Sequence, residues 1–418
     1  MLPSPYRQVR VPEDLESVTT VRHEAEVDPR QVGMTQGERD AIWRSVERIY
    51  RGGTQPAIGL CIRKRGQVVL DRTIGHARGN GPGDNGNEPK VLATPDTPFC
   101  MFSASKAVAA MVVHLLDQLG QLHIDDPVAE YIPEFATHGK GRIRLRDLLT
   151  HRAGIPSVPG SQDDPEMLLD LDRVLHALCD AKPQNGGNGN GRSSYHALSG
   201  GYLLGEVVRR ATGKTLREVM HERILAPLAF EGMNFGVEPE RANDVAVNYD
   251  TGLAIPFPAS MIATRALGVT WSQATTISNH PRFLTGIIPS ANIMTTPNEA
   301  SRFYQLLLDE GELDGVRIFE PRTIRRARTG TRRLVVDGML LAPVRYGLGL
   351  LLGDRLVSPY GPGTPQAFGH PGFLGILCWA DPQRELAVGL LTTGKTVLAP
   401  QWRGFVELLL AIGRAGEN

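Results

Sequence analysis

The chain has 418 residues, of which 41% are hydrophobic and 22% charged, so it can bury a large core in roughly two or three structural units or one two-lobed unit. Its 45 basic and 45 acidic residues cancel, which gives no electrostatic sign of a nucleic acid or an anionic membrane as a partner. The four cysteines have no metal-ligand spacing, and we expect neither a metal nor a cofactor.

The first residues of the chain, 1–34, are polar and rich in proline, and we interpret them as an irregular N-terminal arm. They lack the apolar stretch of a secretion signal. No window of the sequence approaches about 18 uninterrupted apolar residues. We therefore expect a cytoplasmic protein without a membrane span, whose oligomeric state the sequence leaves unknown.

Strand patterns occur towards both ends of the chain, with helical patterns between them. An amphipathic helix opens at Thr35 and runs to about Tyr50, and residues 57–63 and 67–74 form a predicted hairpin. Residues 235–285 are apolar but aperiodic and predict loops over a pocket. Further helices are predicted over 106–119, 144–149, 166–181, 198–212, 216–225, 298–310 and 401–412, and further strands over 347–352, 374–380 and 386–391. This order indicates one sheet built from both termini, with a helical lobe inserted into it.

A Ser-x-x-Lys pattern, Ser103 to Lys106, stands at the start of the helix predicted over 106–119. Residues three apart share a helical face, so Ser103 Oγ and Lys106 Nζ can meet, whereas Ser105 lies off that face. A serine needs a neighbouring base or cation to attack a carbonyl at neutral pH, and a helix start offers N–H donors to an oxyanion. Short patterns also occur by chance, and serine is a common helix cap, so this motif needs support from the rest of the chain.

Two further clusters follow. Tyr195-His196-Ala197 precedes the helix predicted over 198–212, and Phe368-Gly369-His370-Pro371-Gly372-Phe373 leads into the strand predicted over 374–380. Gly372 would allow the strand to approach a substrate closely.

These three motifs and their flanks resemble the serine β-lactamase and penicillin-binding-protein superfamily, and within it the class C β-lactamase-like branch that includes the family VIII carboxylesterases. The likeness covers roughly residues 38–412 and includes the flanking segments 123–133, 145–154, 289–292 and 300–304. It implies an α/β (α+β) fold of the β-lactamase/transpeptidase type, with an antiparallel sheet from both termini flanked by helices. The expected division is the arm 1–34, a sheet domain of 35–102 plus 290–418, and a mostly helical lobe of 103–289, with the active site between the last two.

The resemblance also implies roles in a serine hydrolase acting on small carboxylic esters. Ser103 would be acylated, Lys106 would stabilise its ionised form, and Tyr195, poorly able to keep its proton beside Lys106, would be the general base. The backbone N–H groups of Ser103 and Phe373 would form the oxyanion hole, with His370 and Gly372 at the substrate. His370 has two readings, a pocket-lining donor or an ordinary residue at a strand start.

The chain departs from the lactamases at two motifs. Ala197 stands where they usually carry an asparagine after the tyrosine, and His370-Pro371-Gly372 stands where they carry Lys-Thr-Gly. Both changes look like the esterase members. The alternatives are a β-lactamase or D-amino peptidase, an acyltransferase using the same acyl-enzyme, or a catalytically silent binding homologue.

Other chemistry finds less support in the sequence. No serine has glycine at both −2 and +2, and no His-Glu-x-x-His is present, which disfavours another serine hydrolase class and a metal hydrolase. His123 and His151 are expected to be structural histidines. Asp125-Asp126 before Pro127 is expected to form a turn and cap rather than a catalytic pair.

Overall fold

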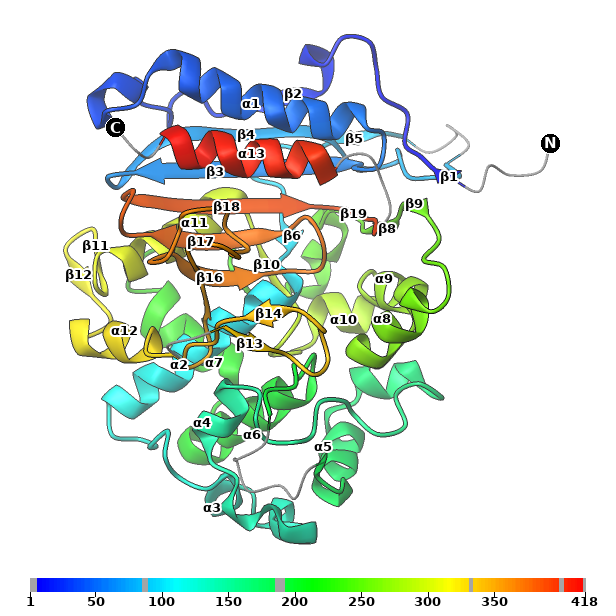
Figure 1. Ribbon diagram of the computed structural model, residues 1–418, viewed down its shortest axis with the longest axis vertical. Helices are drawn as coiled ribbons and strands as arrows, with labels where there is room; N and C mark the ends of the chain where they lie inside the picture. The colour runs from blue at the N-terminus through cyan, green and yellow to red at the C-terminus, as the bar shows by residue number, and fades with distance from the viewer. Residues whose placement is uncertain (1–5, 85–88, 185–191, 331–333, 398–401, 416–418) are drawn as a thin grey trace.

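A computed structural model describes residues 6–84, 89–184, 192–330, 334–397 and 402–415. Its main element is an antiparallel sheet in the order β15-β16-β17-β18-β3-β4-β2, with β5 beside β4 (Figure 1). The N-terminal and C-terminal parts of the chain join where β18 pairs with β3 over seven residues each, from Leu386↔Lys64 to Thr392↔Ile58. The prediction of one antiparallel sheet from both termini is confirmed. The strands of this sheet are β2 (Thr19–Val21), β3 (Ala57–Lys64), β4 (Gln67–Arg78), β5 (Val91–Leu92), β15 (Leu351–Leu352), β16 (Phe368–Pro371), β17 (Leu377–Asp381) and β18 (Leu386–Thr392).

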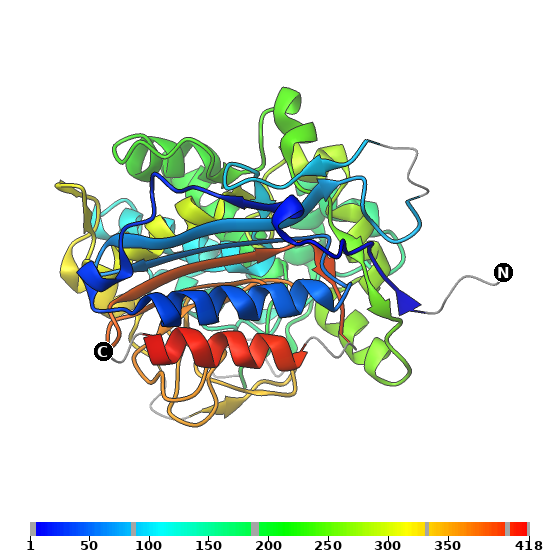
Figure 2. The ribbon, with the colours of Figure 1, turned by 90° about the horizontal axis from the view of Figure 1, so that it is seen from above.

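Two helices cover one face of the sheet, α1 (Gln36–Arg51) and α13 (Trp402–Ala415), which lie side by side in Figure 2. The start of α1 is fixed by a capping box: Thr35 Oγ1 accepts from the Glu38 N–H, and the Glu38 carboxylate accepts from the Thr35 N–H at 2.7 Å. Side chains alternate along β3, so Ile58, Leu60 and Ile62 enter the core beneath α1 and α13.

The other face of the sheet packs against α11 (Pro297–Leu308). Here the strands carry small residues, because the helix comes very close. A Cβ on Gly59 would lie 2.6 Å from Pro297 Cγ, and one on Gly389 would lie 2.5 Å from the Pro297 carbonyl oxygen. This close contact places β10 (Ile293–Thr295), just before α11, beside β6 (Phe99–Cys100), the strand that leads into Ser103.

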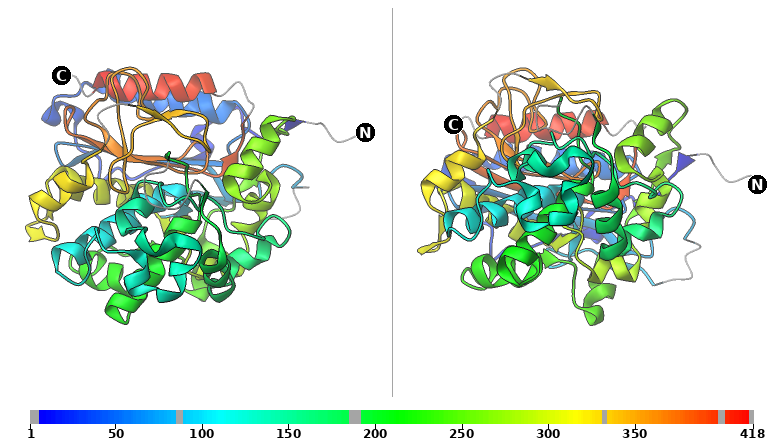
Figure 3. Two further views of the ribbon diagram at one scale, coloured as in Figure 1. Left: turned by 60° about the horizontal axis from the view of Figure 1, so that its bottom comes forward. Right: turned by 90° about the horizontal axis from the view of Figure 1, so that it is seen from below.

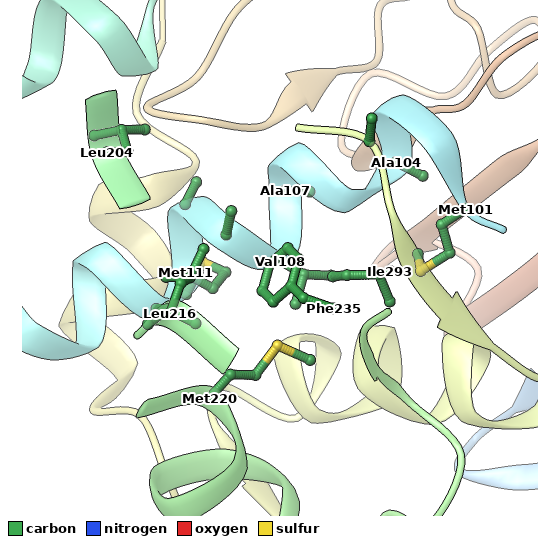
Figure 4. Packing of buried hydrophobic residues seen from close by; sticks show 14 of the residues in the cluster. Met101, Ala104, Ala107, Val108, Met111, Leu204, Leu216, Met220, Phe235 and Ile293 are labelled. Atoms are coloured by element: carbon green, nitrogen blue, oxygen red, sulfur yellow. The ribbon is translucent and has the colours of Figure 1, made fainter. Parts of the chain in front are cut away.

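The helical lobe is built around α2 (Ser105–Gln118), which is buried along most of its length. Figure 3 shows the cyan and green helices gathered on the side of the sheet away from α1 and α13. Figure 4 shows Ala107, Val108 and Met111 of α2 packed against residues of other segments, among them Met220 and Phe235. A helix that is apolar all round must be enclosed, and α2 is enclosed by its neighbours. The other helices of the lobe are α3 (Val128–Tyr131), α4 (Leu145–Leu149), α5 (Leu171–Asp180), α6 (Ser199–Thr212) and α7 (Leu216–Met220).

Several predicted elements differ from the observed ones. The segment predicted as loops over 235–285 contains three short helices, α8 (Ala259–Leu267), α9 (Trp271–Ile277) and α10 (Pro281–Thr285), which are too short to show a clear period. The helix predicted over 166–181 is a 3₁₀ segment, Pro165–Leu169, followed by α5, whose N-cap is Asp170. The strand predicted over 347–352 is reduced to β15.

The N-terminal arm is not wholly irregular. β1 (Tyr6–Arg7) pairs with β9 (Gly252–Leu253), and β2 joins the edge of the main sheet. The remaining elements are β6 (Phe99–Cys100), β7 (Asn234–Phe235), β8 (Tyr249–Asp250), β11 (Glu312–Leu313), β12 (Val316–Arg317), α12 (Pro321–Ala327), β13 (Val335–Val336), β14 (Pro343–Val344) and β19 (Gly394–Lys395). The division into a sheet domain and a lobe stays a prediction. Within the described residues, no helix combines the length and the apolar character needed to cross a membrane.

Candidate active site

Ser103 lies in a 3₁₀ turn, Phe102–Ala104, immediately before α2. The turn is anchored by the strands beside it, since β6 pairs with β10 and the Met101 N–H donates to the Ile293 carbonyl at 2.8 Å. Ser105 is fully buried, and its Oγ accepts from the Ile293 N–H at 3.0 Å. Ser105 therefore has a structural role, which leaves Ser103 as the serine of the motif that faces a cavity.

Lys106 reaches back to Ser103 as the three-residue spacing predicts. Its Nζ lies 3.0 Å from Ser103 Oγ and 3.1 Å from the Ser290 carbonyl oxygen. Neither partner is a carboxylate, and desolvation around the amine lowers the pKa of Lys106 to about 7. A large fraction of Lys106 is thus neutral near neutral pH, with a lone pair that can accept a proton.

Tyr195 completes this group. Its side chain is 7% exposed, and Lys106 Nζ lies 5.0 Å from the centre of its ring. Burial raises the pKa of Tyr195 above its ordinary value, and the interaction of its hydroxyl with the Ser103 side chain opposes this only in part. The raised pKa favours the protonated phenol in the free protein, whereas the lowered pKa of Lys106 favours its neutral amine. The role of Tyr195 as the general base stays a prediction.

Asp337 holds the backbone of Tyr195 in place. Its Oδ1 accepts from the N–H groups of Tyr195, Met339 and Leu340, and its Oδ2 accepts from the Tyr346 hydroxyl at 3.1 Å. No prediction from the sequence included Asp337, because it lies 142 residues from Tyr195 and no local pattern surrounds it. Only the fold brings the two together.

His151 lies behind Tyr195, with ring centres 4.9 Å apart, and 4.8 Å from the ring of Tyr346. Its Nδ1 accepts from the His196 N–H at 3.1 Å, so it is held by backbone as expected. Its position against Tyr195 was not predicted. Burial lowers the pKa of His151 well below the usual value, so its ring is neutral. His123, by contrast, is exposed, and Asp126 accepts from its N–H as a turn and cap residue should.

His370 ends up beside Tyr195, with ring centres 6.2 Å apart, and is 3% exposed. Burial first, and then the Lys106 charge, lowers the pKa of His370 to about 3, so the imidazole is neutral. Its Nδ1 lies 2.6 Å from the Pro371 carbonyl oxygen and must donate to it. The other nitrogen, Nε2, is then an acceptor and has no hydrogen-bond partner among the described residues. His370 is not among the residues that line the cavity beside Ser103, and its contact with a substrate stays a prediction.

Gly372 and Phe373 follow at the end of β16. A Cβ on Gly372 would lie 2.5 Å from the Met101 carbonyl oxygen, so glycine is needed for β16 to approach the nucleophile segment. The ring of Phe373 lies 5.3 Å from that of Phe102, the residue before Ser103. In the described part of the chain, the Phe373 N–H donates to no protein acceptor.

An apolar cavity of ≈ 70 Å³ opens beside Ser103. Its apolar walls suit a hydrophobic acyl chain. Its lining comprises Phe102, Ser103, Leu168, Ala197, Leu198, Leu267, Val269, Ala274, Ile277, Phe283, Ala291 and Phe373. The segment 235–285, predicted to lie over a pocket, contributes five of these residues, from Leu267 to Phe283, whereas Leu253 and Phe257 of the same segment do not line the cavity and are exposed by 42% and 79%. Among the described residues, no three His, Cys, Asp or Glu side chains gather as a metal site would require.

The chain belongs to the beta-lactamase family, whose model, described as "Beta-lactamase", matches residues 46–410. It is 30% identical over 307 residues to "Esterase/beta-lactamase LipL" of Mycobacterium tuberculosis (strain ATCC 25618 / H37Rv), an overlap of 71% of this chain and 69% of that protein. The protein is thus a hydrolase of the beta-lactamase fold.

Solved structures share the same architecture. A penicillin-binding protein homologue from Caulobacter crescentus matches with a TM-score of 0.76 at 26% identity, covering 92% of this chain and 99% of that chain. A family VIII carboxylesterase matches with a TM-score of 0.75 at 24% identity, again over 92% of this chain and 99% of the other. The β-lactamase/transpeptidase-like fold expected from the sequence is confirmed.

Proposed function

We propose that the protein hydrolyses small carboxylic esters through an acyl-enzyme formed on Ser103. The observation that carries the proposal is the 3.0 Å contact between Ser103 Oγ and Lys106 Nζ, made by an amine whose pKa burial lowers to about 7. A base with a pKa near the working pH combines the correct protonation state with sufficient strength. The nucleophile and its base are therefore within reach of each other, and the base has a pKa that lets it accept a proton near neutral pH.

In the first half of the reaction, neutral Lys106 takes the Ser103 proton as Oγ bonds to the ester carbonyl carbon. The carbonyl oxygen becomes an oxyanion and accepts from the N–H groups of Ser103 and Phe373. When the intermediate collapses, the bond to the leaving alcohol breaks and the alkoxide takes a proton. Tyr195, whose hydroxyl contacts Ser103 and holds its proton, passes that proton on and regains one from the Lys106 ammonium.

In the second half, water attacks the acyl-enzyme at the same carbonyl carbon. Lys106, neutral again, takes a proton from the water by way of Tyr195, the ester bond to Oγ breaks, and Ser103 recovers its proton.

Esters are favoured over β-lactams by the charge of the site. His370 stands where the lactamases carry a lysine, and burial keeps it neutral, so it offers no cation to a substrate carboxylate. Losing one positioned charged hydrogen bond costs about 1.5–3 kcal/mol. An ester has a good leaving group and needs no such anchor, and the apolar cavity beside Ser103 accepts a short acyl chain.

The test is a substrate panel: p-nitrophenyl acetate, butyrate and octanoate, nitrocefin, a penicillin and a D-alanyl peptide, each with and without an added alcohol as acyl acceptor. We expect the highest kcat/KM with acetate or butyrate. A nitrocefin or peptide value at or above the best ester would replace the esterase assignment with a lactamase or peptidase one. An ester product formed faster than free acid would indicate an acyltransferase.

Labelling with a fluorophosphonate tests the nucleophile separately. The probe should modify one peptide, the one containing Ser103, and Ser103→Ala should abolish the modification. Ser105→Ala is the matched control, because Ser105 lies two residues away and its hydroxyl is buried against the Ile293 N–H, so the change should leave the labelling in place. Labelling that survives Ser103→Ala would exclude Ser103 as the nucleophile.

A further inference from the structure

We propose that Lys395 is a positioning residue of the oxyanion hole, tying together the two strained backbone segments that carry the Ser103 and Phe373 N–H groups. The proposal deepens the function proposed above and rests on it, since those two N–H groups form the hole only if Ser103 is the nucleophile. No motif in the sequence marks Lys395, which lies beyond the end of β18.

Lys395 is a fully buried lysine whose position is not explained by an ion pair. Its side chain is 0% exposed, and in the described part of the chain no carboxylate lies within ion-pair distance of it. Desolvation lowers its pKa to about 7. Burying an amine without a counter-charge costs folding free energy, so a benefit elsewhere must offset it.

The amine contacts the nucleophile side of the hole. Lys395 Nζ lies 4.6 Å from the centre of the Phe102 ring, the residue directly before Ser103. Phe102 has φ +47°, in the left-handed region that non-glycine residues rarely occupy. Such a conformation is strained and persists only where the surroundings enforce it. The contact of Lys395 with the ring is one of the interactions that hold Phe102 there.

The same amine is linked to the other side of the hole. Lys395 Nζ donates to the Thr392 carbonyl at 2.6 Å, and Thr392 Oγ1 donates to the Leu374 carbonyl at 3.4 Å. Leu374, directly after Phe373, is also strained, with φ +32°. Phe102 and Leu374 thus adjoin the two proposed oxyanion donors, and Lys395 is linked to both.

The backbone of Lys395 adds a third link. Its carbonyl accepts from Trp271 Nε1 at 3.1 Å, and the Trp271 ring lies 4.2 Å from the ring of Phe373. Phe373 in turn packs against Phe102 at 5.3 Å. Lys395, Trp271, Phe373 and Phe102 are therefore connected by a continuous set of contacts next to the two oxyanion donors. A displacement of about 1 Å in a catalytic group can cost about 10²-fold in rate, so the loss of these contacts should slow the chemical step rather than weaken substrate binding.

The test compares Lys395→Met with Lys140→Met. Met keeps most of the apolar stem and removes the amine. Lys140 is a matched control because it is also fully buried, lies 5.2 Å from the ring of Phe135, and donates to the Ala181 carbonyl at 2.6 Å, all in the helical lobe. For each variant, kcat and KM are measured with p-nitrophenyl acetate, together with the rate of Ser103 labelling by a fluorophosphonate.

We expect Lys395→Met to lower kcat and the labelling rate about 10- to 100-fold, with KM changed by less than about threefold. Lys140→Met should keep kcat and the labelling rate within about twofold at matched folded fraction. If Lys395→Met keeps both rates as well, Lys395 is only a structural lysine and the proposal is overturned. If Lys395→Met does not fold, Thr392→Val interrupts the link to Leu374 and should lower the labelling rate about 3- to 10-fold; an unchanged rate overturns the proposal too.

The labelling readout separates this proposal from the proposed function. If wild-type protein hydrolyses no ester but Ser103 is still labelled, the substrate assignment fails while the comparison of Lys395→Met with wild type stands. If esters are hydrolysed and Lys395→Met is labelled at the wild-type rate, the substrate assignment stands and the Lys395 proposal fails.

Discussion

The protonation of Lys106 should control the pH dependence of catalysis. Its pKa is lowered from 10.5 to about 7 because its amine is desolvated and pairs with no carboxylate. If neutral Lys106 is the base, the active fraction falls from about nine-tenths at about pH 8 to about one-tenth at about pH 6. We therefore expect kcat/KM for p-nitrophenyl acetate to decrease about tenfold between these pH values.

The three buried histidines near Ser103 do not titrate between about pH 6 and pH 8. Burial lowers the pKa of His196 to about 4 and that of His370 to about 3, and it places the pKa of His151 well below the usual value. Lys395, by contrast, has a pKa of about 7. The control is therefore Lys395→Met, whose residual kcat/KM should show the same decrease between about pH 8 and about pH 6. Lys106→Met should lose most of its activity, and its remaining kcat/KM should no longer decrease over this pH range.

The lowered pKa of Lys106 also predicts how the free energy of unfolding depends on pH. An unfolded lysine has a pKa of about 10.4, so between about pH 7 and 10.4 the unfolded chain binds a proton that folded Lys106 lacks. The contribution of Lys106 to stability must then rise with pH across this window and be lost as the pH falls towards 7. The free energy of unfolding should gain up to about 1.4 kcal/mol per pH unit from Lys106, or about 5 kcal/mol between about pH 7 and about pH 10.4.

Urea unfolding of wild type and Lys106→Met at about pH 7.5 and about pH 8.5 measures this contribution. The difference in the free energy of unfolding should move by about 1.2 kcal/mol in favour of wild type at the higher pH. A pH-independent difference, together with a flat kcat/KM between about pH 6 and 8, would show that Lys106 is not a neutral base in this range.

Further predictions concern the groups around Ser103. Tyr195→Phe should lower kcat about 10²–10⁴-fold while unfolding in urea at nearly the wild-type midpoint; near-wild-type kcat would direct the search for the proton carrier to His370. Phe283→Leu should enlarge the cavity beside Ser103 and raise the ratio of octanoate to acetate kcat/KM about tenfold, and an unchanged ratio would place the acyl chain elsewhere. Asp337→Asn should destabilise the fold by about 2–4 kcal/mol in urea unfolding, because its carboxylate accepts from three N–H groups and the Tyr346 hydroxyl; a loss below about 0.5 kcal/mol would contradict that account.

The sequence alone determined those features that depend on local spacing. The three-residue interval between Ser103 and Lys106 is enough to bring their side chains together, because it is fixed by helix geometry. The capping box at Thr35 placed the start of α1, and the strand patterns at both ends of the chain indicated a shared sheet. The motif order with its flanks indicated the family.

Only the tertiary structure decided the electrostatics of the site and its distant supports. The pKa values of Lys106, Tyr195 and His370 follow from burial by segments far apart in the chain, which no local pattern encodes. Asp337 contacts Tyr195 and Lys395 contacts Phe102 across long sequence separations. The residues next to Asp337 and Lys395 in the sequence form no motif that would predict these contacts. The short helices α8 to α10 likewise form only where they pack over the site, because isolated helices of that length are unstable in water.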